Sequence, residues 1–313
     1  MPGQRQKVYV ITGATAVGKS AVAQLIAKRI GAEIVSADSR QVYIGMDIGT
    51  AKPSYAERKA VRHHVTDVVR PDEDYNVALF KEQALEAIGD IHRRGLRAMV
   101  VGGTGFYIRA LLEGLTFQGI GRDDEVRAAI EAEVEAKGKQ AVYEELKRLD
   151  PDAAERIHPN NIPRMVRALE VIRLTGRPFS EIFDKPAGKE GPAHEYVAVC
   201  VDMDREALYR RINRRVEEMV HAGWAEEVAR LIGEGYSPDL RAMNALGYRE
   251  MVDYVEGAIT LRQAVDAISK ATRNFAQKQL TFFRGLEGLE WVDMDIATDI
   301  EAMASVVVER FGM

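Results

Sequence analysis

The sequence contains one cysteine, Cys200, and no long apolar run. A single cysteine excludes an intramolecular disulfide and any zinc site built from several cysteines. No apolar run approaches the roughly 20 residues that a membrane helix needs. The first residues, MPGQRQKVYVITG, show neither a charged-then-apolar leader nor a cleavage site. We therefore expect a cytoplasmic protein outside the membrane, with Cys200 as a small buried residue of the apolar run YVAVCV.

An excess of positive charge is also lacking, because the net charge is −5. This value argues against a general polyanion binder. Basic residues are nevertheless concentrated in three stretches, 156–177, 205–215 and 262–284, which hold five Arg or Lys each. Local basic surfaces bind nucleic acid whatever the net charge. The alternative, that each stretch is a solvated helix face, stays open.

Short apolar runs alternate with helical patterns in the first third of the chain. Residues 8–12, 33–37 and 97–101 form apolar runs of strand length, while 21–30 and 75–94 show the spacing of amphipathic helices. Strands that alternate with helices indicate a parallel sheet covered by helices on both faces. The sequence therefore predicts an α/β fold.

The pattern changes after about Gly114. Residues 123–176 show helical spacing interrupted by prolines, 185–192 has the composition of a loop, and 196–201 returns to a buried-strand pattern. A long basic helix is expected from Arg205. We predict a core of residues 1–115 and 193–313, which includes the C-terminal helices, and an all-helical insertion domain of residues 116–192.

A phosphate-binding motif follows the first predicted strand and precedes a predicted helix. It fits the pattern G-x-x-x-x-G-K-[ST] with Gly13, Ala14, Thr15, Ala16, Val17, Gly18, Lys19 and Ser20. In such P-loops the backbone N–H groups and the helix N-terminus surround an anion. Lys19 adds a positive charge, and the Ser20 hydroxyl is a candidate ligand of Mg²⁺. The motif specifies a diphosphate or a triphosphate, without selecting ATP.

The remaining parts of an ATPase are missing. The predicted strand 97–101 ends in Gly102-Gly103-Thr104-Gly105, where a Walker B carboxylate would be expected. An arginine-rich lid of the small-molecule kinase type is not evident near the core. The groups that aim a nucleophile at a γ-phosphate are therefore not apparent.

Two polar residues follow predicted strands and are candidates for chemistry. Asp38 follows the second strand and Thr104 follows the third. The carboxyl ends of strands line the ligand crevice of open α/β sheets, so both residues should face the phosphate loop. Asp38 suits a general base or a turn cap, and its position alone does not decide between them. The Thr104 hydroxyl can donate to a phosphate oxygen.

Together these segments resemble the tRNA dimethylallyltransferase family, also called tRNA isopentenyltransferases, over nearly the whole chain. The resemblance rests on six segments in a fixed order: GATAVGKS, SADSRQVYIGMDIGTAKP, HHVTDV, VGGTGFY, MNALGYRE and RNFAQKQLTFFR. Val17, Arg40 and Phe282-Phe283 depart from residues that are frequent in the family. None of these departures removes a group that the mechanism needs.

The resemblance implies a P-loop-type α/β enzyme that binds dimethylallyl diphosphate with Mg²⁺. The acceptor would be the exocyclic amino group of the adenosine 3′ of the anticodon, position 37 of tRNA. Asp38 matches the general base, Thr104 a phosphate-side hydroxyl, and Arg211 a residue at the diphosphate, although Arg215 shares its helix face. The matched tRNA contacts are Asp38, Ser39, Arg40, Gln41, Thr104, Arg127, Asn160, Asn161, Ile162, Pro163, Arg164, Asn244, Gly247, Tyr248, Arg249, Gln277, Lys278, Gln279 and Arg284.

Three alternatives remain beside this interpretation. A related enzyme that prenylates free adenine nucleotides would share the core, but it would need neither the insertion nor the basic C-terminal stretches. A P-loop small-molecule kinase would need the missing Walker B carboxylate and lid. A non-catalytic RNA-binding module would not need Asp38 and Thr104 opposite the phosphate loop. We expect a monomer, and we expect Trp224 and Trp291 to pack rather than to stack on bases.

Overall fold

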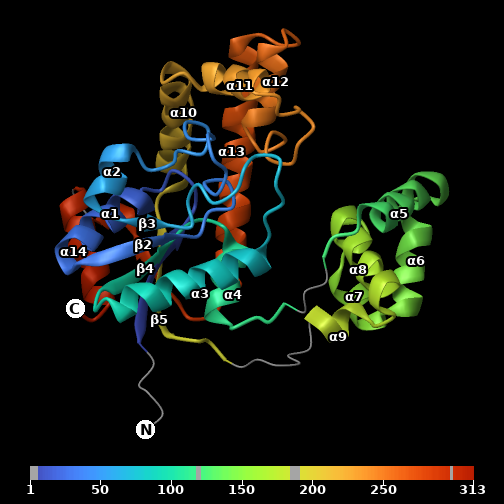
Figure 1. Ribbon diagram of the computed structural model, residues 1–313, viewed down its shortest axis with the longest axis horizontal. Helices are drawn as coiled ribbons and strands as arrows, with labels where there is room; N and C mark the ends of the chain where they lie inside the picture. Colours follow the sequence, from blue (N-terminus) through green and yellow to red (C-terminus); the bar gives the residue numbers. More distant parts are fainter. Residues whose placement is uncertain (1–5, 118–120, 184–190, 297–298) are drawn as a thin grey trace. The chain divides into compact units, whose positions relative to one another are not determined.

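The computed structural model describes residues 6–117, 121–183, 191–296 and 299–313. Within these ranges, parallel strands form one six-stranded sheet in the order β3-β2-β4-β1-β5-β6 (Figure 1). The strands are β1 (Lys7–Gly13), β2 (Ala32–Ser36), β3 (His63–His64), β4 (Arg97–Val101), β5 (Glu195–Asp202) and β6 (Leu289–Asp293).

The chain divides into two compact units. One unit combines Met1–Leu112 with Pro192–Met313, and the other is Glu113–Gly191. The first unit contains the sheet and the helices α1 (Lys19–Ile30), α2 (Tyr55–Ala60), α3 (Val77–Arg93), α4 (Gly105–Leu112), α10 (Arg205–His221), α11 (Trp224–Gly233), α12 (Tyr248–Val255), α13 (Leu261–Arg284), α14 (Ile300–Arg310) and the short 3₁₀ helix Met294–Ile296.

The two faces of the sheet have separate hydrophobic cores. Side chains of a strand alternate between faces, so Val8 and Val10 of β1 join one core while Tyr9 and Ile11 join the other. Helices α3 and α4 cover the first face, and α1 and α14 cover the second (Figure 1). This layering buries both faces, as all-parallel sheets require, and it confirms the predicted α/β fold.

The functional edge of the sheet is the one where the parallel strands end. Strand β4 pairs with both β1 and β2, so the loops after these three strands emerge side by side. Helices α10 to α13 are stacked beyond this edge, at the top of Figure 1. The loops and helices thus supply opposite walls for a site within the first unit.

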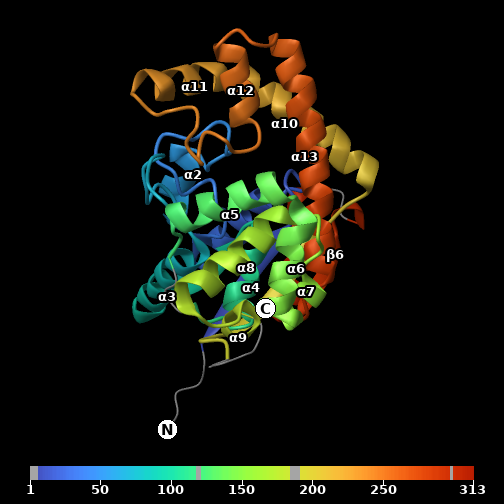
Figure 2. The ribbon, with the colours of Figure 1, turned by 90° about the vertical axis from the view of Figure 1, so that its right-hand side faces the viewer.

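In the residues that the structure describes, the secondary structure of the second unit is helical, without strands. It comprises α5 (Asp124–Lys137), α6 (Lys139–Leu149), α7 (Pro151–Arg156), α8 (Ile162–Thr175) and α9 (Phe179–Phe183), of which α5 to α8 are plain in Figure 2. Its own core includes Ile130, Leu146, Met165 and Leu169, all fully buried. A separate core of this kind indicates a unit with its own stability.

The four strands expected from the sequence are present, and the sheet has two more. The sequence pattern did not single out β6, whose exposed residues interrupt the apolar run, or β3, which is only two residues long. The loop expected at 185–192 lies, up to residue 190, outside the described residues.

Candidate active site

The phosphate loop connects β1 to α1 and carries the backbone conformations that its glycines allow. Gly13 and Gly18 have φ angles of 145° and 107°, in the region that side chains disfavour. A Cβ atom at Gly13 would collide with the Val201 carbonyl oxygen of β5. Lys19 Nζ donates to the Ala14 carbonyl oxygen at 3.1 Å, which folds the lysine back over the loop. The predicted motif therefore has the shape of an anion cradle.

Gln279 of α13 bridges this cradle to the loop after β4. Its Oε1 atom accepts a hydrogen bond from the Thr15 backbone N–H at 2.9 Å, and its Nε2 atom donates to the Gly103 carbonyl oxygen at 2.8 Å. The side chain is 7% exposed. The sequence interpretation placed Gln279 among tRNA contacts, whereas the structure gives its amide two partners inside the protein.

Asp38 and Thr104 lie next to each other at the ends of β2 and β4. Gly102 makes this approach possible, because a Cβ atom there would collide with the backbone of Ala37. The Thr104 N–H donates to the Ala37 carbonyl oxygen at 3.2 Å, and the Thr104 hydroxyl accepts from the Ser39 N–H at 2.9 Å. The hydroxyl hydrogen of Thr104 is thus free to point toward a ligand.

Each oxygen of the Asp38 carboxylate has a different environment. Oδ1 accepts hydrogen bonds from the backbone N–H groups of Arg40 at 2.8 Å and Gln41 at 3.3 Å. Among the described residues, no donor lies within hydrogen-bond distance of Oδ2. Asp38 therefore caps the turn with one oxygen and keeps the other available as a proton acceptor, so the two roles left open by the sequence are compatible.

A cavity of about 360 Å³ joins the phosphate loop to these two residues. Its polar end is lined by Thr15, Lys19, Ser20, Asp38 and Thr104, together with Arg215 of α10. Its apolar side is formed by α10, α11 and α13 and by the loop before α12, with the lining residues Ile212, Val216, Met219, Trp224, Leu246, Ile268, Thr272 and Phe275. The arrangement suits a ligand with a charged head and an apolar tail.

The polar end carries positive charge that lacks a permanent counterion. Burial and the nearby Arg215 lower the pKa of Lys19 to about 8, although the negative charge of Asp38 acts against them. Burial also lowers the pKa of Arg215, again opposed by Asp38. Within the described parts of the chain, no carboxylate lies within ion-pair distance of either side chain. Cations held in this way favour an anionic ligand.

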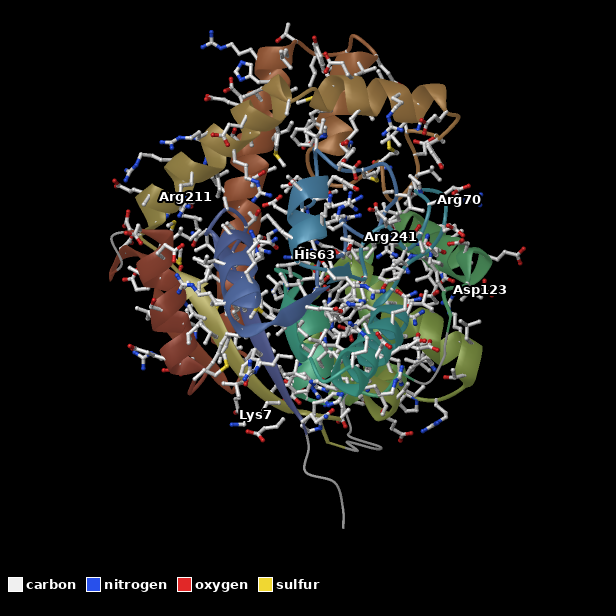
Figure 3. All side chains as sticks on the ribbon, turned by 60° about the vertical axis from the view of Figure 1, so that its left-hand side comes forward. Lys7, His63, Arg70, Asp123, Arg211 and Arg241 are labelled. Carbon is white, nitrogen blue, oxygen red and sulfur yellow. The ribbon has the colours of Figure 1, made fainter. Side chains whose placement is uncertain are left out.

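Two arginines of α10 lie near the phosphate loop and make different contacts. Arg215 lines the cavity. Arg211, labelled in Figure 3, is exposed and donates from Nη1 to the Val17 carbonyl oxygen at 3.3 Å. Arg215 therefore lines the cavity, whereas Arg211 contacts the phosphate loop from outside that lining, and the assignment of Arg211 to the diphosphate stays a prediction.

The pKa of Lys19 predicts how binding of an anionic ligand depends on pH. Above pH 8 the free protein holds Lys19 neutral, and an anion favours its protonated form, so binding takes up a proton. The affinity for a diphosphate should therefore fall by up to about tenfold per pH unit above pH 8. Calorimetric titration between pH 7 and pH 10 measures this slope. Lys19→Arg stays charged over this range, and an equal slope in that variant would assign the proton to another group.

Glu227 fastens α11 to the loop that forms one wall of the cavity. Its carboxylate accepts hydrogen bonds from the backbone N–H groups of Asp47 and Ile48 at 2.8 Å and of Gly49 at 3.2 Å. It also accepts one from the Tyr248 hydroxyl at 2.6 Å. Burial and the charge of Glu227 raise the pKa of Tyr248. The carboxylate is 7% exposed, so these bonds hold the loop firmly.

Trp224 occupies the corner that this clamp creates. A Cβ atom at Gly49 or at Gly247 would collide with its indole ring, and its ring meets that of Tyr248 edge-on at 5.7 Å. Trp224 is 2% exposed, in agreement with the packing role expected from the sequence, and it also lines the cavity.

A second cavity of about 340 Å³ shares Ser39, Arg40 and Thr104 with the first. Its other lining residues include Arg241 and the aromatic side chains of Tyr43, Tyr75, Phe106 and Tyr107. The Arg40 guanidinium donates to the Arg241 carbonyl oxygen at 3.4 Å, and burial lowers the pKa of Arg40. Aromatic rings and guanidinium groups are the side chains on which unstacked RNA bases and phosphates bind.

Several of the residues expected to contact tRNA in the first unit have hydrogen-bond or packing partners inside the protein. Gln41 donates to the carbonyl oxygens of Thr50 and Ala51, and the Asn244 amide donates to carbonyl oxygens of its own loop. Tyr248 is 1% exposed, and Gly247 lies against Trp224. Ser39, Arg40, Gln277 and Arg284 remain partly or largely exposed, as do the side chains of Arg249 and Lys278.

Among the contacts expected in the helical unit, some residues also have partners inside the protein and others are exposed. Arg127 forms ion pairs with Glu131 and with Glu170, which is fully buried. Asn160 accepts from Lys139 Nζ at 2.7 Å, and Asn161 caps α8, whose first turn holds Ile162 and Pro163. Arg164 is exposed, and no carboxylate lies within ion-pair distance of it in the described ranges. Arg164 is therefore the residue of this group that is free to bind an external anion.

Sequence reasoning gave no role to two groups that shape the site. Glu227 is an acidic residue in the first turn of α11, a common position for an exposed acid. Its burial in the structure shows that it anchors the loop. Lys52 lies in the quoted segment DIGTAKP, and its buried ammonium donates to the Tyr43 carbonyl oxygen and to the carboxylates of Asp47 and Asp67. A lysine side chain is rarely buried without such partners. The one hint in the sequence was that Lys52 belongs to a segment on which the family resemblance rests.

The sequence profile of the family described as IPP transferase matches residues 41–286, and a profile described as isopentenyl transferase matches residues 6–71. The chain belongs to the IPP transferase family. The family resemblance expected from the sequence is confirmed.

Relatives of this family are similar over their full lengths. A tRNA dimethylallyltransferase of Pelotomaculum thermopropionicum is 43% identical over 97% of this chain and 96% of its own length. One of Thermotoga maritima is 40% identical over 98% of this chain and 100% of its own length. The similarity therefore includes the helical unit as well as the core.

Solved structures of IPP transferases agree with the fold. The full-length tRNA isopentenylpyrophosphate transferase of Bacillus halodurans is 39% identical and superposes with a TM-score of 0.70, over 98% of this chain and 97% of its own. A eukaryotic dimethylallyltransferase described as acting on tRNA is 27% identical with a TM-score of 0.75, over 98% of this chain and 77% of its own. In the parts of this chain that the structure describes, every helix is too short or too polar to cross a lipid bilayer.

Proposed function

We propose that the protein transfers a dimethylallyl group from dimethylallyl diphosphate to the exocyclic amino group of the adenosine 3′ of the anticodon in tRNA, and releases diphosphate. The observation that carries the proposal is the cavity in which a phosphate loop faces Asp38 and Thr104 and which continues along an apolar wall. The names of the relatives support both the donor and the tRNA acceptor.

The chemistry requires a base on one side of the allylic carbon and an anion site on the other. The adenine nitrogen forms a bond to the first carbon of the donor while the bond from that carbon to the diphosphate oxygen breaks. The free Oδ2 atom of Asp38 takes the proton that leaves the nitrogen. General base catalysis of this kind typically raises the reaction rate by about 10²–10⁴-fold. The loop N–H groups, Lys19 and Arg215 stabilise the negative charge that develops on the leaving diphosphate.

The residues present also suit Mg²⁺. Ser20 lines the cavity at the phosphate loop, and the described residues contain no cluster of three His, Cys, Asp or Glu side chains that could hold a metal alone. Mg²⁺ commonly binds through substrate phosphates and keeps several waters, so one hydroxyl is a sufficient protein ligand. When bound, the ion would neutralise charge on the diphosphate.

The acceptor must reach Asp38 as a base removed from its stack. Removing a base from a stack costs a few kcal/mol and requires a pocket. The second cavity borders Asp38 through Ser39 and Arg40, and its two arginines and the exposed ring of Phe106 suit the neighbouring nucleotides of an RNA loop. A free adenine nucleotide would use none of these groups, which favours tRNA. We take the active form to be a monomer.

Labelled dimethylallyl diphosphate tests the proposal directly. The protein is incubated with the donor and Mg²⁺ and with tRNA, AMP or no acceptor, and label in each acceptor is measured. We expect label in tRNA alone. Label in AMP would support the nucleotide-prenylating alternative. Phosphate release from ATP, stimulated by an acceptor, would support a kinase, and tRNA binding without transfer would leave an RNA-binding module.

Arg164 provides a test of the helical unit as a tRNA-binding element. Replacing Arg164 with Ala should weaken tRNA binding and lower the slope of log affinity against log salt by about 0.7–0.9, the value for one lost phosphate contact. Donor binding should not change, because the donor occupies the other unit. Salt titrations of tRNA binding measure the slope.

Arg173 of the same helix is the matched control for Arg164. Its guanidinium is already paired with Glu133 and Glu145, at 2.8 and 3.1 Å, so Arg173→Ala should leave the salt slope unchanged. Parallel lines of equal affinity for the wild type and Arg164→Ala would show that this residue does not bind tRNA.

A further inference from the structure

The apolar wall of the main cavity follows one face of α10. Ile212, Val216 and Met219 line the cavity at spacings of four and three residues, which places them on one side of the helix. The preceding residue, Arg211, contacts the phosphate loop, so Ile212 lies at the charged end of the cavity. At a rise of about 1.5 Å per residue, Met219 lies about 10 Å farther along the helix.

Helix α13 forms the opposite side and runs in the reverse direction. Its Gln279 contacts the phosphate loop, while Ile268, three turns earlier, lines the same cavity. The two helices pack against each other. The cavity is therefore a slot whose charged end lies at the phosphate loop and whose apolar end lies toward Met219 and Ile268.

The wall of the slot is buried, and its rim is exposed. Ile212, Val216 and Ile268 are at most 3% exposed, whereas the lining residues Leu246 and Phe275 are 38% and 43% exposed. A hydrocarbon tail gains most when it lies along the buried wall. The exposed rim is then left for the acceptor base.

Trp224 lines the apolar side of the cavity and cannot move aside easily. It is fixed by Gly49, Gly247 and Tyr248, and the Glu227 clamp joins these elements through four hydrogen bonds. A rigid wall discriminates by length, because a longer ligand cannot push it away without breaking buried hydrogen bonds.

We propose that Met219 and Trp224 limit the prenyl donor to one isoprene unit, a specificity that rests on the proposed function. An isoprene unit adds four bonds to a chain, or about 5 Å with C–C bonds of about 1.5 Å. This length matches one helical turn of about 5.4 Å. The first unit of a donor bound at the phosphate loop reaches Val216, and a second unit meets Met219 and Trp224.

The test enlarges the slot at the second unit. Met219→Ala is compared with the wild type for binding of geranyl diphosphate by calorimetry, and for transfer of geranyl and dimethylallyl groups to tRNA. We expect the ratio of kcat/KM for geranyl over dimethylallyl diphosphate to rise about 10–100-fold, the range for relieving a mismatch of a few carbons in an apolar pocket. Geranyl diphosphate should bind more tightly by a similar factor.

Val220→Ala is the matched control. Val220 is the next residue of α10, packs into the core and does not line the cavity. An unchanged geranyl preference in folded Met219→Ala, or an equal gain in Val220→Ala, would overturn the proposal. If Met219→Ala does not fold, Ile268→Val shortens the opposite wall and should give a smaller gain in the same direction; no gain in that variant would count against the slot.

Two readouts keep this inference separate from the proposed function. Absence of dimethylallyl transfer to tRNA by the wild type would refute the function, but the affinities for geranyl diphosphate would still decide the role of Met219. Conversely, normal dimethylallyl transfer with no change in geranyl affinity would retain the function and refute the length limit.

Discussion

Asp38→Asn is expected to lower the single-turnover rate of prenyl transfer by about 10²-fold or more, with little change in binding of donor or tRNA. An asparagine can still accept hydrogen bonds from the Arg40 and Gln41 N–H groups through Oδ1, so the turn should persist. It cannot accept a proton at the position of Oδ2. Rapid-quench kinetics at saturating donor measure the loss, and equilibrium titrations measure binding.

Asp202 supplies a control for Asp38. It also stands at the carboxyl end of a strand, β5, but it does not line the cavity, and its Oδ2 lies 3.8 Å from Arg284. Asp202→Asn should therefore retain most of the single-turnover rate. Equal rates for wild type and Asp38→Asn would remove Asp38 as the base, and equal losses in both variants would point to a general electrostatic effect.

Arg215→Met is expected to reduce kcat/KM for the donor by about 10²–10³-fold, the usual effect of removing one group that stabilises charge in a transition state. Arg215 lines the charged end of the cavity and interacts with Lys19 and Asp38. A methionine keeps much of the side-chain volume but removes the charge. Steady-state kinetics at varied donor concentration provide the measurement.

Arg211→Met separates the two arginines of α10. Arg211 makes one hydrogen bond to the Val17 carbonyl oxygen from outside the cavity, and the loss of a bond of this kind should cost about tenfold or less. A larger loss in Arg211→Met than in Arg215→Met would support the assignment to Arg211 that the family resemblance favours.

The core of the fold was predictable because each short apolar run between helical patterns could be interpreted only as a buried strand. Residues 8–12 and 97–101 are short apolar runs bounded by Gly or charged residues, and they became adjacent parallel strands. The last strand, β6, was not predicted, because it is an edge strand with several exposed positions and its apolar pattern is weak. Sheet order was also outside the reach of local patterns, since pairing of β1 with β5 joins segments separated by the whole helical unit.

The site was predictable where it depends on strand ends and not where it depends on helix packing. Asp38 and Thr104 follow strands, and parallel strands bring their ends together. The choice between Arg211 and Arg215 depends on the rotation of α10 about its axis, which spacing alone does not define. Gln279 and Tyr248 lie in segments on which the family resemblance rests. Their burial depends on how α12 and α13 pack in the core, so the sequence did not predict it.

The clamp around Glu227 also governs how substitutions will combine. Gly49, Trp224, Glu227, Gly247 and Tyr248 each contact another member of the group, so a change at one alters the surroundings of the rest. Effects of substitutions in such a group do not add, and interaction energies of about 0.5–3 kcal/mol are usual. Variation of this corner will therefore succeed only in sets, such as a smaller ring at position 224 together with a larger residue at position 49, while the φ of +89° at Gly247 favours glycine at that position.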